Sequence, residues 1–131
     1  MILLVGTGID IVEIGRIERL IEKYGRAFLN KVFTDSEIEY CDNKARPAVH
    51  FSGRWAVKEA FYKAVPVACQ KFSTWHSIEV LSRQPAGKPE IRLLSESLRG
   101  AFDEYRITEY HTSISHERKY CVAQVYLVGK N

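Results

Sequence analysis

Apolar residues follow different spacings in successive segments of this chain, and each spacing predicts a type of secondary structure. Residues 2–12 are apolar at nearly every position except for two glycines, a threonine and Asp10. This run predicts a β-strand, and its continuous apolarity indicates a strand that is covered on both sides. In residues 13–23, isoleucines and a leucine recur three or four positions apart. This spacing predicts an amphipathic helix, which Gly25 ends.

Three more helices are expected before Pro66. Residues 26–32 form a short helical segment, and Thr34-Asp-Ser-Glu37 is a capping box, which predicts the start of the next helix. A longer central helix covers residues 51–64, with Pro47 in its first turn and its end near Pro66. Its aromatic residues and alanines recur at helical spacing, so we expect this helix to pack against a sheet or another helix.

The second half of the chain alternates strands with turns. Residues 67–74 are an irregular connection, and the last strand is expected in the middle of a sheet because it is among the most apolar segments. Helices and strands interleave, with hairpins among the strands, which predicts the α+β class and a single domain over residues 1–131. The expected elements are a strand at 75–81, a turn at 84–89, a strand at 90–93, a helix at 95–105, and strands at 112–115 and 120–128 around a turn at 116–119.

The composition is that of an ordinary globular protein and narrows the classes of function. Of the 131 residues 46% are hydrophobic, and the net charge of +3 is spread over similar numbers of basic and acidic residues, which argues against a nucleic-acid partner. Cys41, Cys69 and Cys121 have no metal-binding spacing, so they are expected as free thiols in the cytoplasm. The apolar N-terminus lacks a basic flank and is short, which predicts neither a signal peptide nor a membrane span.

Polar residues border apolar segments at three places, which are Asp10, the stretch 54–63, and Ser115-His116. A buried acid is costly unless it is paired, so Asp10 is either a core aspartate held by hydrogen-bond donors or a metal ligand. Glu59 and Lys63 are one helical turn apart, and by themselves they also fit an exposed ion pair. His116 follows an apolar strand and is a base, a phosphate-binding donor or merely a turn residue.

Together, Asp10 and Glu59 offer two carboxylates. This number suits magnesium, which takes one or two protein carboxylates and completes its shell with water and phosphate oxygens. The chain has neither a Walker loop nor a kinase-type glycine-rich loop, which argues against ordinary nucleotide triphosphate hydrolysis. The sequence therefore predicts a magnesium-and-phosphate site whose substrate it does not name. Positive charge for more than one phosphate would come from Arg54, Lys58, Lys63 and the Gly87-Lys88 turn.

Four sequence blocks follow one another over nearly the whole chain. They are Gly6-Thr-Gly-Ile-Asp10-Ile-Val-Glu-Ile14, Arg54-Trp-Ala-Val-Lys-Glu59-Ala-Phe-Tyr-Lys63-Ala64, Gly87-Lys-Pro89, and Ser113-Ile-Ser-His116 followed by Tyr120-Cys-Val-Ala123. In content, order and approximate spacing, these blocks resemble the bacterial holo-acyl-carrier-protein synthases, which are short-chain members of the 4′-phosphopantetheinyl transferase superfamily. One block alone would carry little weight, whereas four blocks in order make the resemblance specific.

The resemblance implies a 4′-phosphopantetheinyl transferase-like fold, in which a mainly antiparallel sheet packs on a long central helix. It also implies a homotrimer whose active sites are shared between subunits. The implied reaction transfers the 4′-phosphopantetheine group from coenzyme A to a serine of apo acyl carrier protein and releases adenosine 3′,5′-bisphosphate, as a step of fatty acid biosynthesis. The implied metal is Mg²⁺, with Mn²⁺ as an alternative. Tyr62 departs from the family pattern, which often has a small residue there.

By matching positions, the resemblance also implies roles for single residues. Asp10 and Glu59 would hold the metal, and Glu59 would also remove the serine proton, directly or through a metal-bound water. Lys63 would contact the phosphates and protonate or shield the leaving group. The positions expected around the nucleotide and its 3′-phosphate are Arg54, Lys58, Lys63, Gly87, Lys88, Pro89, Ser115 and His116, and His116 also counts as catalytic. Those expected to dock the acidic carrier protein are Arg16, Arg26 and Phe28.

Two other functions are compatible with the residues alone. One is a non-enzymatic adaptor that binds an acidic protein through the arginines of the first helix. It predicts that Asp10 and Glu59 tolerate alanine. The other is a magnesium-dependent hydrolase of a different phosphate ester, which would release its product without a protein acceptor.

Overall fold

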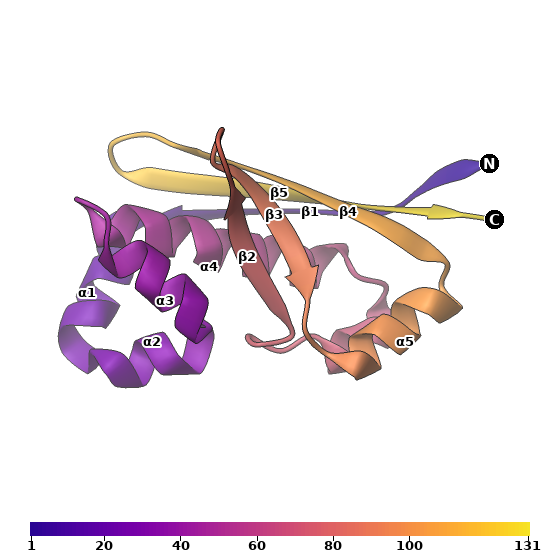
Figure 1. The fold of residues 1–131 in the computed structure, drawn as a ribbon, viewed down its shortest axis with the longest axis horizontal. Coiled ribbons are helices and arrows are strands. Elements are labelled where there is room, and N and C mark those ends of the chain that lie inside the picture. The colour runs from indigo at the N-terminus through magenta and orange to yellow at the C-terminus, as the bar shows by residue number, and fades with distance from the viewer.

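A three-stranded antiparallel sheet covers one long helix in the computed structural model, which describes all 131 residues (Figure 1). The strands lie in the order β1 (Ile2–Glu13), β5 (Tyr120–Lys130) and β4 (Ile107–His116), and α4 (Pro47–Ala64) runs along them. The last strand is therefore central, as its apolar sequence predicts. The α+β class and the antiparallel sheet on a long helix are confirmed.

The first three helices pack at one end of α4 (Figure 1). The predicted capping box is present, because the side chain of Thr34 accepts from the backbone N–H of Glu37 and the carboxylate of Glu37 accepts from that of Thr34. Pro47 occupies the first turn of α4, and the helix ends before Pro66. These predicted helices are confirmed as α1 (Ile14–Tyr24), α2 (Arg26–Val32) and α3 (Asp35–Asp42).

A hairpin of β2 (Ile78–Arg83) and β3 (Lys88–Leu93) runs across the direction of the long strands, and α5 (Glu96–Glu104) follows it (Figure 1). The prediction for β2 was three residues too early, because residues 74–77 form a turn in which Ser77 N donates to Thr74 O at 3.1 Å. The connection at 67–74 is more regular than predicted, since it contains a 3₁₀ helix, η1 (Val67–Phe72). Strand β4 begins five residues before the predicted start.

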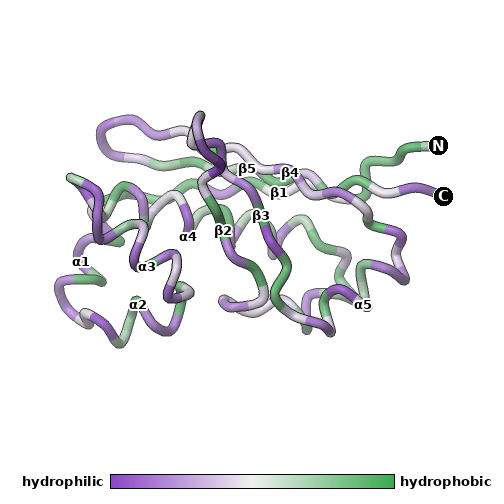
Figure 2. Tube along the Cα trace, viewed as in Figure 1, coloured by the Kyte–Doolittle hydropathy of each residue, from purple (hydrophilic) through white to green (hydrophobic).

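The core lies around α4, and none of the helices is long and apolar enough to cross a membrane. The prediction that the first strand is covered on both sides is wrong for the single chain. Ile9 is 58% and Ile11 is 66% exposed. They belong to an outer sheet face, opposite α4, made by Thr7, Ile9, Ile11, Val122, Gln124 and Tyr126. Figure 2 shows that the N-terminal end of β1 is also hydrophobic.

Candidate active site

Strand β1 approaches the backbone of α4 closely, and two glycines permit this approach. A Cβ atom at Gly6 would lie 2.0 Å from the carbonyl oxygen of Ala64, and one at Gly8 would lie 1.8 Å from that of Ala60. No side chain fits at such distances, so only glycine allows this spacing. Asp10 follows on the same face of the strand, because side chains alternate along a strand. The strand therefore places a carboxylate against the helix.

Asp10 of β1 and Lys63 of α4 form an ion pair at the edge of this contact. Lys63 Nζ lies 3.1 Å from Asp10 Oδ1, and it also donates to the carbonyl oxygen of Ile9 at 3.0 Å. The side chain of Asp10 is 14% exposed, whereas that of Lys63 is 52% exposed. Lys63 thus turns toward Asp10, and the alternative of a simple surface pair with Glu59 is not what the structure contains.

The carboxyl group of Glu59 belongs to the same cluster, which we call the acid cluster (Asp10, Glu59 and Lys63). Burial raises the pKa of Glu59, and the negative charge of Asp10 raises it further, while Lys63 and Arg16 lower it. The two acids are therefore close enough to repel each other. A divalent cation between them would relieve this repulsion. The structure contains no group of three or more potential metal-binding side chains, so such a cation would take its other ligands from water or substrate.

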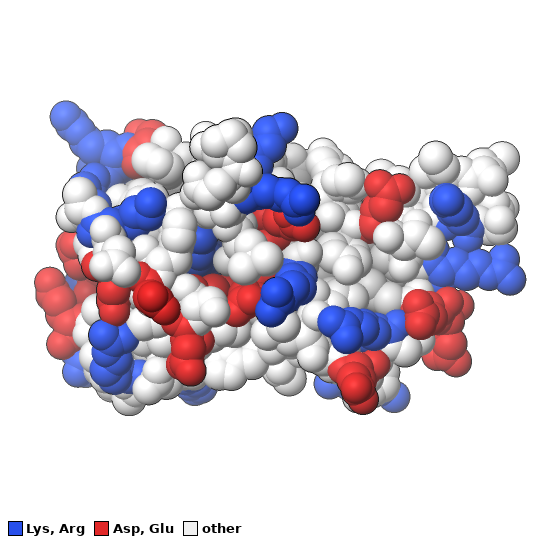
Figure 3. Space-filling view, in the orientation of Figure 1, with Lys and Arg blue, Asp and Glu red and all other residues white.

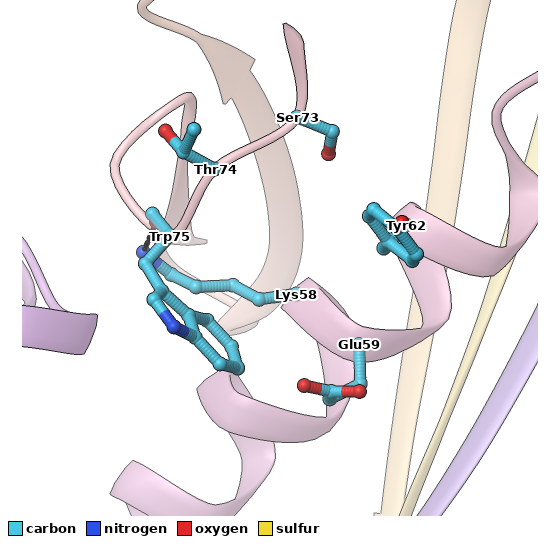
Figure 4. A pocket seen from close by; sticks show the side chains of 6 residues that line it. All are labelled: Lys58, Glu59, Tyr62, Ser73, Thr74 and Trp75. Atoms are coloured by element: carbon cyan, nitrogen blue, oxygen red, sulfur yellow. Dashed lines mark hydrogen bonds between the residues drawn. The ribbon is translucent and has the colours of Figure 1, made fainter. Parts of the chain in front are cut away.

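A cavity of about 420 Å³ opens beside Glu59, between α4 and the loop at residues 73–75 (Figure 4). Its volume is within the usual range for small-molecule sites. The indole of Trp75 stacks on that of Trp55 with 4.7 Å between ring centroids. The residues that line the cavity are Lys58, Glu59, Tyr62, Ser73, Thr74 and Trp75. Because Tyr62 is exposed, it belongs to this cavity and not to the buried face of α4.

Lys58 has a structural place, and its predicted role in binding the nucleotide has to be corrected. The residue is only 4% exposed, and its ammonium lies 2.8 Å from Glu37 Oε1. It also donates to three backbone carbonyl oxygens. An ammonium has three N–H donors, so none is left for a phosphate. Lys58 lines the cavity beside Glu59, but its ammonium is engaged by these four partners.

Arg54 is also buried, at 4% exposure, and lies at a different cavity. Its Nη2 donates to Ser82 Oγ at 3.0 Å, its guanidinium stacks 4.2 Å from the ring centroid of Tyr40, and its Nε has no partner. This cavity, of about 390 Å³, shares no lining residue with the one beside Glu59. A single chain therefore does not bring Arg54 into the acid cluster.

The remaining predicted nucleotide positions also lie apart from the acid cluster. His116 is exposed at the end of β4, near His50 in the first turn of α4. Glu59 is nine residues farther along this helix, a distance of about 14 Å. Ser115 is exposed beside His116, and Gly87 is exposed at the hairpin turn with a φ of 72°. Lys88 and Pro89, which were predicted in that turn, begin β3 instead.

Two of the three predicted docking residues, Arg16 of α1 and Phe28 of α2, contact the same ring, and Arg26 of α2 pairs elsewhere. The guanidinium of Arg16 lies 5.7 Å from the ring centroid of Trp55, and Phe28 packs on the same ring at 6.0 Å. Arg26 pairs with Asp42 at 2.8 Å. Trp55 in turn stacks on Trp75, so this ring is continuous with the wall of the cavity beside Glu59.

Sequence reasoning missed the loop at residues 73–75 as part of the site. The alternation around Trp75 indicated a strand, whereas the residue lies in the turn before β2. A tryptophan among serines and threonines was the available signal. Glu37 was recognised for its capping role, and nothing in its local sequence indicates that it also binds a buried lysine.

Sequence comparison with known proteins identifies one family. The family model of the 4′-phosphopantetheinyl transferase superfamily matches residues 6–125. The holo-(acyl-carrier-protein) synthase of Geobacter sulfurreducens is 42% identical over 122 residues, which are 93% of this chain and 95% of that protein.

Solved structures lead to the same family. The holo-(acyl-carrier-protein) synthase from Neisseria meningitidis superposes with a TM-score of 0.81 and 29% identity over 95% of this chain and 98% of the other. The Bacillus anthracis synthase, solved in complex with CoA (3′,5′-ADP), has a TM-score of 0.76 and 32% identity over 97% of this chain and 98% of the other. The chain therefore belongs to the holo-(acyl-carrier-protein) synthase family of the 4′-phosphopantetheinyl transferase superfamily.

Proposed function

We propose that this chain transfers the 4′-phosphopantetheine group of coenzyme A to a serine of apo acyl carrier protein. The observation that carries the proposal is the acid cluster, formed by β1 and α4 in a chain of this family. In the reaction, the serine oxygen bonds to the phosphorus that bears the pantetheine arm. The bond from that phosphorus to the bridging oxygen breaks, and adenosine 3′,5′-bisphosphate leaves. The product serves fatty acid biosynthesis.

Asp10 and Glu59 are the residues that would hold Mg²⁺ or Mn²⁺ in this proposal. Their mutual repulsion and their two carboxylates fit a hard divalent cation, which would leave room for oxygen ligands from outside the protein. When bound, the metal supplies positive charge near the leaving bridging oxygen. The chain's own contribution is position, since β1 and the ion pair with Lys63 hold the carboxylate of Asp10 in place.

Glu59 is the proposed base for the serine proton, directly or through a water molecule. A raised pKa makes its carboxylate a stronger base. Lys63 is the proposed contact for the diphosphate, because its exposed ammonium can reach a phosphate oxygen from its present position beside Asp10. Glu59 would then act on the attacking serine hydroxyl, and Lys63 on the diphosphate that is cleaved.

We also propose a homotrimer in which a neighbouring subunit completes each site. The outer sheet face exposes the side chains of Ile9, Ile11 and Tyr126, and an exposed apolar face of this kind fits contact with another copy of the chain. Such a neighbour would bring nucleotide-binding residues to the acid cluster, which they do not reach within one chain. These residues are Arg54, Gly87, Lys88, Pro89, Ser115 and His116.

The carrier protein is proposed to dock on α1 and α2 through Arg16, Arg26 and Phe28. Figure 3 shows basic and acidic side chains interspersed over the face in view, so local arginines and not the net charge would direct an acidic partner. Phe28 adds an apolar contact beside Trp55. The three free, buried cysteines suit the cytoplasm as the place of the reaction.

The test is incubation of the full chain with coenzyme A, Mg²⁺ and apo acyl carrier protein, followed by mass spectrometry of the carrier. We expect the carrier to gain the mass of one phosphopantetheine group, and adenosine 3′,5′-bisphosphate to appear in equal amount. An unmodified carrier beside cleaved coenzyme A would instead indicate a hydrolase. An unmodified carrier beside intact coenzyme A would contradict both enzymatic functions.

A further inference from the structure

The ammonium of Lys58 joins segments that are far apart in the sequence. It donates to the carbonyl oxygens of Val32 at 3.0 Å, Trp75 at 2.6 Å and Ile78 at 3.2 Å, and it pairs with Glu37 at 2.8 Å. Burial lowers the pKa of this lysine, and Glu37 opposes that effect. A buried charge with this many partners strongly restrains the groups around it.

Two contacts from α4 hold Trp75 in place. Lys58 binds its carbonyl oxygen, and Trp55 stacks on its ring at 4.7 Å between centroids. The rest of the loop is held internally, because Thr74 N donates to Ser77 Oγ at 2.8 Å and Ser77 Oγ donates to Phe72 O at 2.8 Å. Figure 4 shows Lys58 extending from α4 to Trp75, with the side chain of Ser73 pointing toward Tyr62 across the cavity. Lys58 thus fastens this wall to the helix that carries Glu59.

The chemistry of the lining decides which part of coenzyme A fits the cavity. Apart from Glu59 and Lys58, the residues that line it are uncharged, namely Tyr62, Ser73, Thr74 and Trp75. The ammonium of Lys58 is fully engaged elsewhere, so the cavity offers no free positive charge for a 3′-phosphate. A neutral chain of amides and methylenes suits such walls, and the pantetheine arm is the neutral chain attached to the diphosphate.

We propose that Lys58 is a positioning residue, which fastens the loop at residues 73–75 as the wall against which the pantetheine arm of coenzyme A lies. This inference rests on the proposed function, because it requires coenzyme A as the substrate. Lys58 itself touches neither the phosphates nor the arm through its charge. Its effect is transmitted through the carbonyl group of Trp75.

The test compares two full-length variants that both lack the buried ion pair. Glu37→Gln keeps the bond from Lys58 to Trp75, whereas Glu37→Gln combined with Lys58→Met removes it without leaving an unpaired buried carboxylate. The double variant also loses the bonds from Lys58 to Val32 and Ile78. We expect it to raise the KM for coenzyme A about tenfold relative to Glu37→Gln, because the loop at residues 73–75 is then no longer bonded to α4 through Lys58. Its kcat should stay within about twofold, because the arm is bound equally before and during the transfer.

The product provides the decisive comparison, because adenosine 3′,5′-bisphosphate has no arm. Its inhibition constant should be the same in both variants. The near-ultraviolet circular dichroism of the Trp55–Trp75 stack should decrease in the double variant, and these are the only two tryptophans of the chain. If the double variant binds coenzyme A and the product more weakly to the same extent, or binds both unchanged, the inference is overturned.

If the double variant does not fold, the single variant Trp75→Ala tests the same inference. Trp75→Ala removes the wall and leaves the Lys58–Glu37 pair intact, and it should raise the KM for coenzyme A without changing product inhibition. Unchanged affinity for coenzyme A in this variant also overturns the inference. Failure of the proposed function is recognised separately, since the unaltered chain would then not modify the carrier at all.

Discussion

At the scale of single residues, Gly8 is the position at which the fold of the site depends most on having no side chain. Alanine there would place its Cβ 1.8 Å from the carbonyl oxygen of Ala60, so β1 would have to move away from α4. We expect Gly8→Ala to lower the free energy of unfolding by about 3 kcal/mol, which urea denaturation would measure. Transfer activity should fall as well, because Asp10 moves with the strand.

The matched control is Gly100→Ala, in the middle of α5. A Cβ at Gly100 meets no atom within 4 Å, so alanine should stabilise the helix by roughly 0.5–1 kcal/mol. If Gly8→Ala were as stable as this control, close approach of β1 to α4 would not be needed for folding.

Glu59 is expected to be a residue that serves activity at the expense of stability. Burial and the charge of Asp10 raise its pKa, and Lys63 and Arg16 offset this only in part. The folded chain therefore disfavours the ionised form of Glu59. Between the ordinary glutamate pKa of about 4.3 and the raised value, the folded chain holds a proton that the unfolded chain has released. Stability therefore falls as pH rises through this interval, and the penalty is complete above it.

Glu59→Gln removes that penalty together with the proposed base. In metal-free buffer at pH 7 the variant should melt at a higher temperature than the parent, and the difference should vanish at about pH 4 or below. Transfer should drop at least about 100-fold, while coenzyme A still binds at high Mg²⁺. Calorimetry and carrier mass spectrometry measure the two effects, and full activity in the variant would remove Glu59 from the chemistry.

Among the helices and strands, features that depend on residues close in sequence could be predicted. Features that depend on contacts between distant segments could not. The capping box at Thr34, Pro47 at the start of α4 and the apolar run of β5 are local signals, and each marked its element correctly. The burial of Lys58 was not predictable, since its acceptors come from Val32, Trp75 and Ile78. Its charge suggested phosphate binding because periodicity cannot reveal an acceptor on another segment.

The candidate site divides in the same way. Asp10 and Glu59 were singled out as carboxylates near apolar segments, and the structure does bring them into one cluster. The loop around Trp75 was missed because a turn closed by Ser77 interrupts what resembles a strand. The separation of His116 from Glu59 was not predictable either, because it depends on how β4 packs near the start of α4.

Helix α1 carries the prediction for carrier docking. Arg16→Ala removes an exposed charge beside Trp55 and should raise the KM for the carrier about three- to tenfold, equivalent to roughly 1 kcal/mol, with a smaller effect on coenzyme A. Steady-state kinetics with each substrate varied in turn would measure this. Lys130→Ala is the control, because it removes an equal charge from the exposed far end of β5. Equal effects of Arg16→Ala on both substrates would argue against docking.

At the scale of the whole molecule, the single chain leaves two things incomplete. Its sheet exposes apolar side chains opposite α4, and Lys63 is the one basic residue of its acid cluster. A closed ring of copies would remedy both at once, because the neighbour that covers the outer sheet face would also contribute a surface to the site. Glu59 and His116 would then act in the same site while belonging to different subunits.

Mixing two inactive variants tests whether the sites are shared. Glu59→Gln and His116→Ala are each expected to lose most activity alone. If the two variants are mixed in equal parts, unfolded and refolded, the rings form at random. About a quarter of the interfaces then combine an intact Glu59 with an intact His116, so about a quarter of the parent activity should be recovered.

Adding Ile11→Glu to both variants should abolish the recovery and yield monomers in light scattering, because a charge would then lie on the outer sheet face. Val67→Glu, which places the same charge at an exposed apolar residue of η1, should leave assembly and recovery unchanged. Absence of recovery in a mixture that does assemble would place Glu59 and His116 in the same subunit's site.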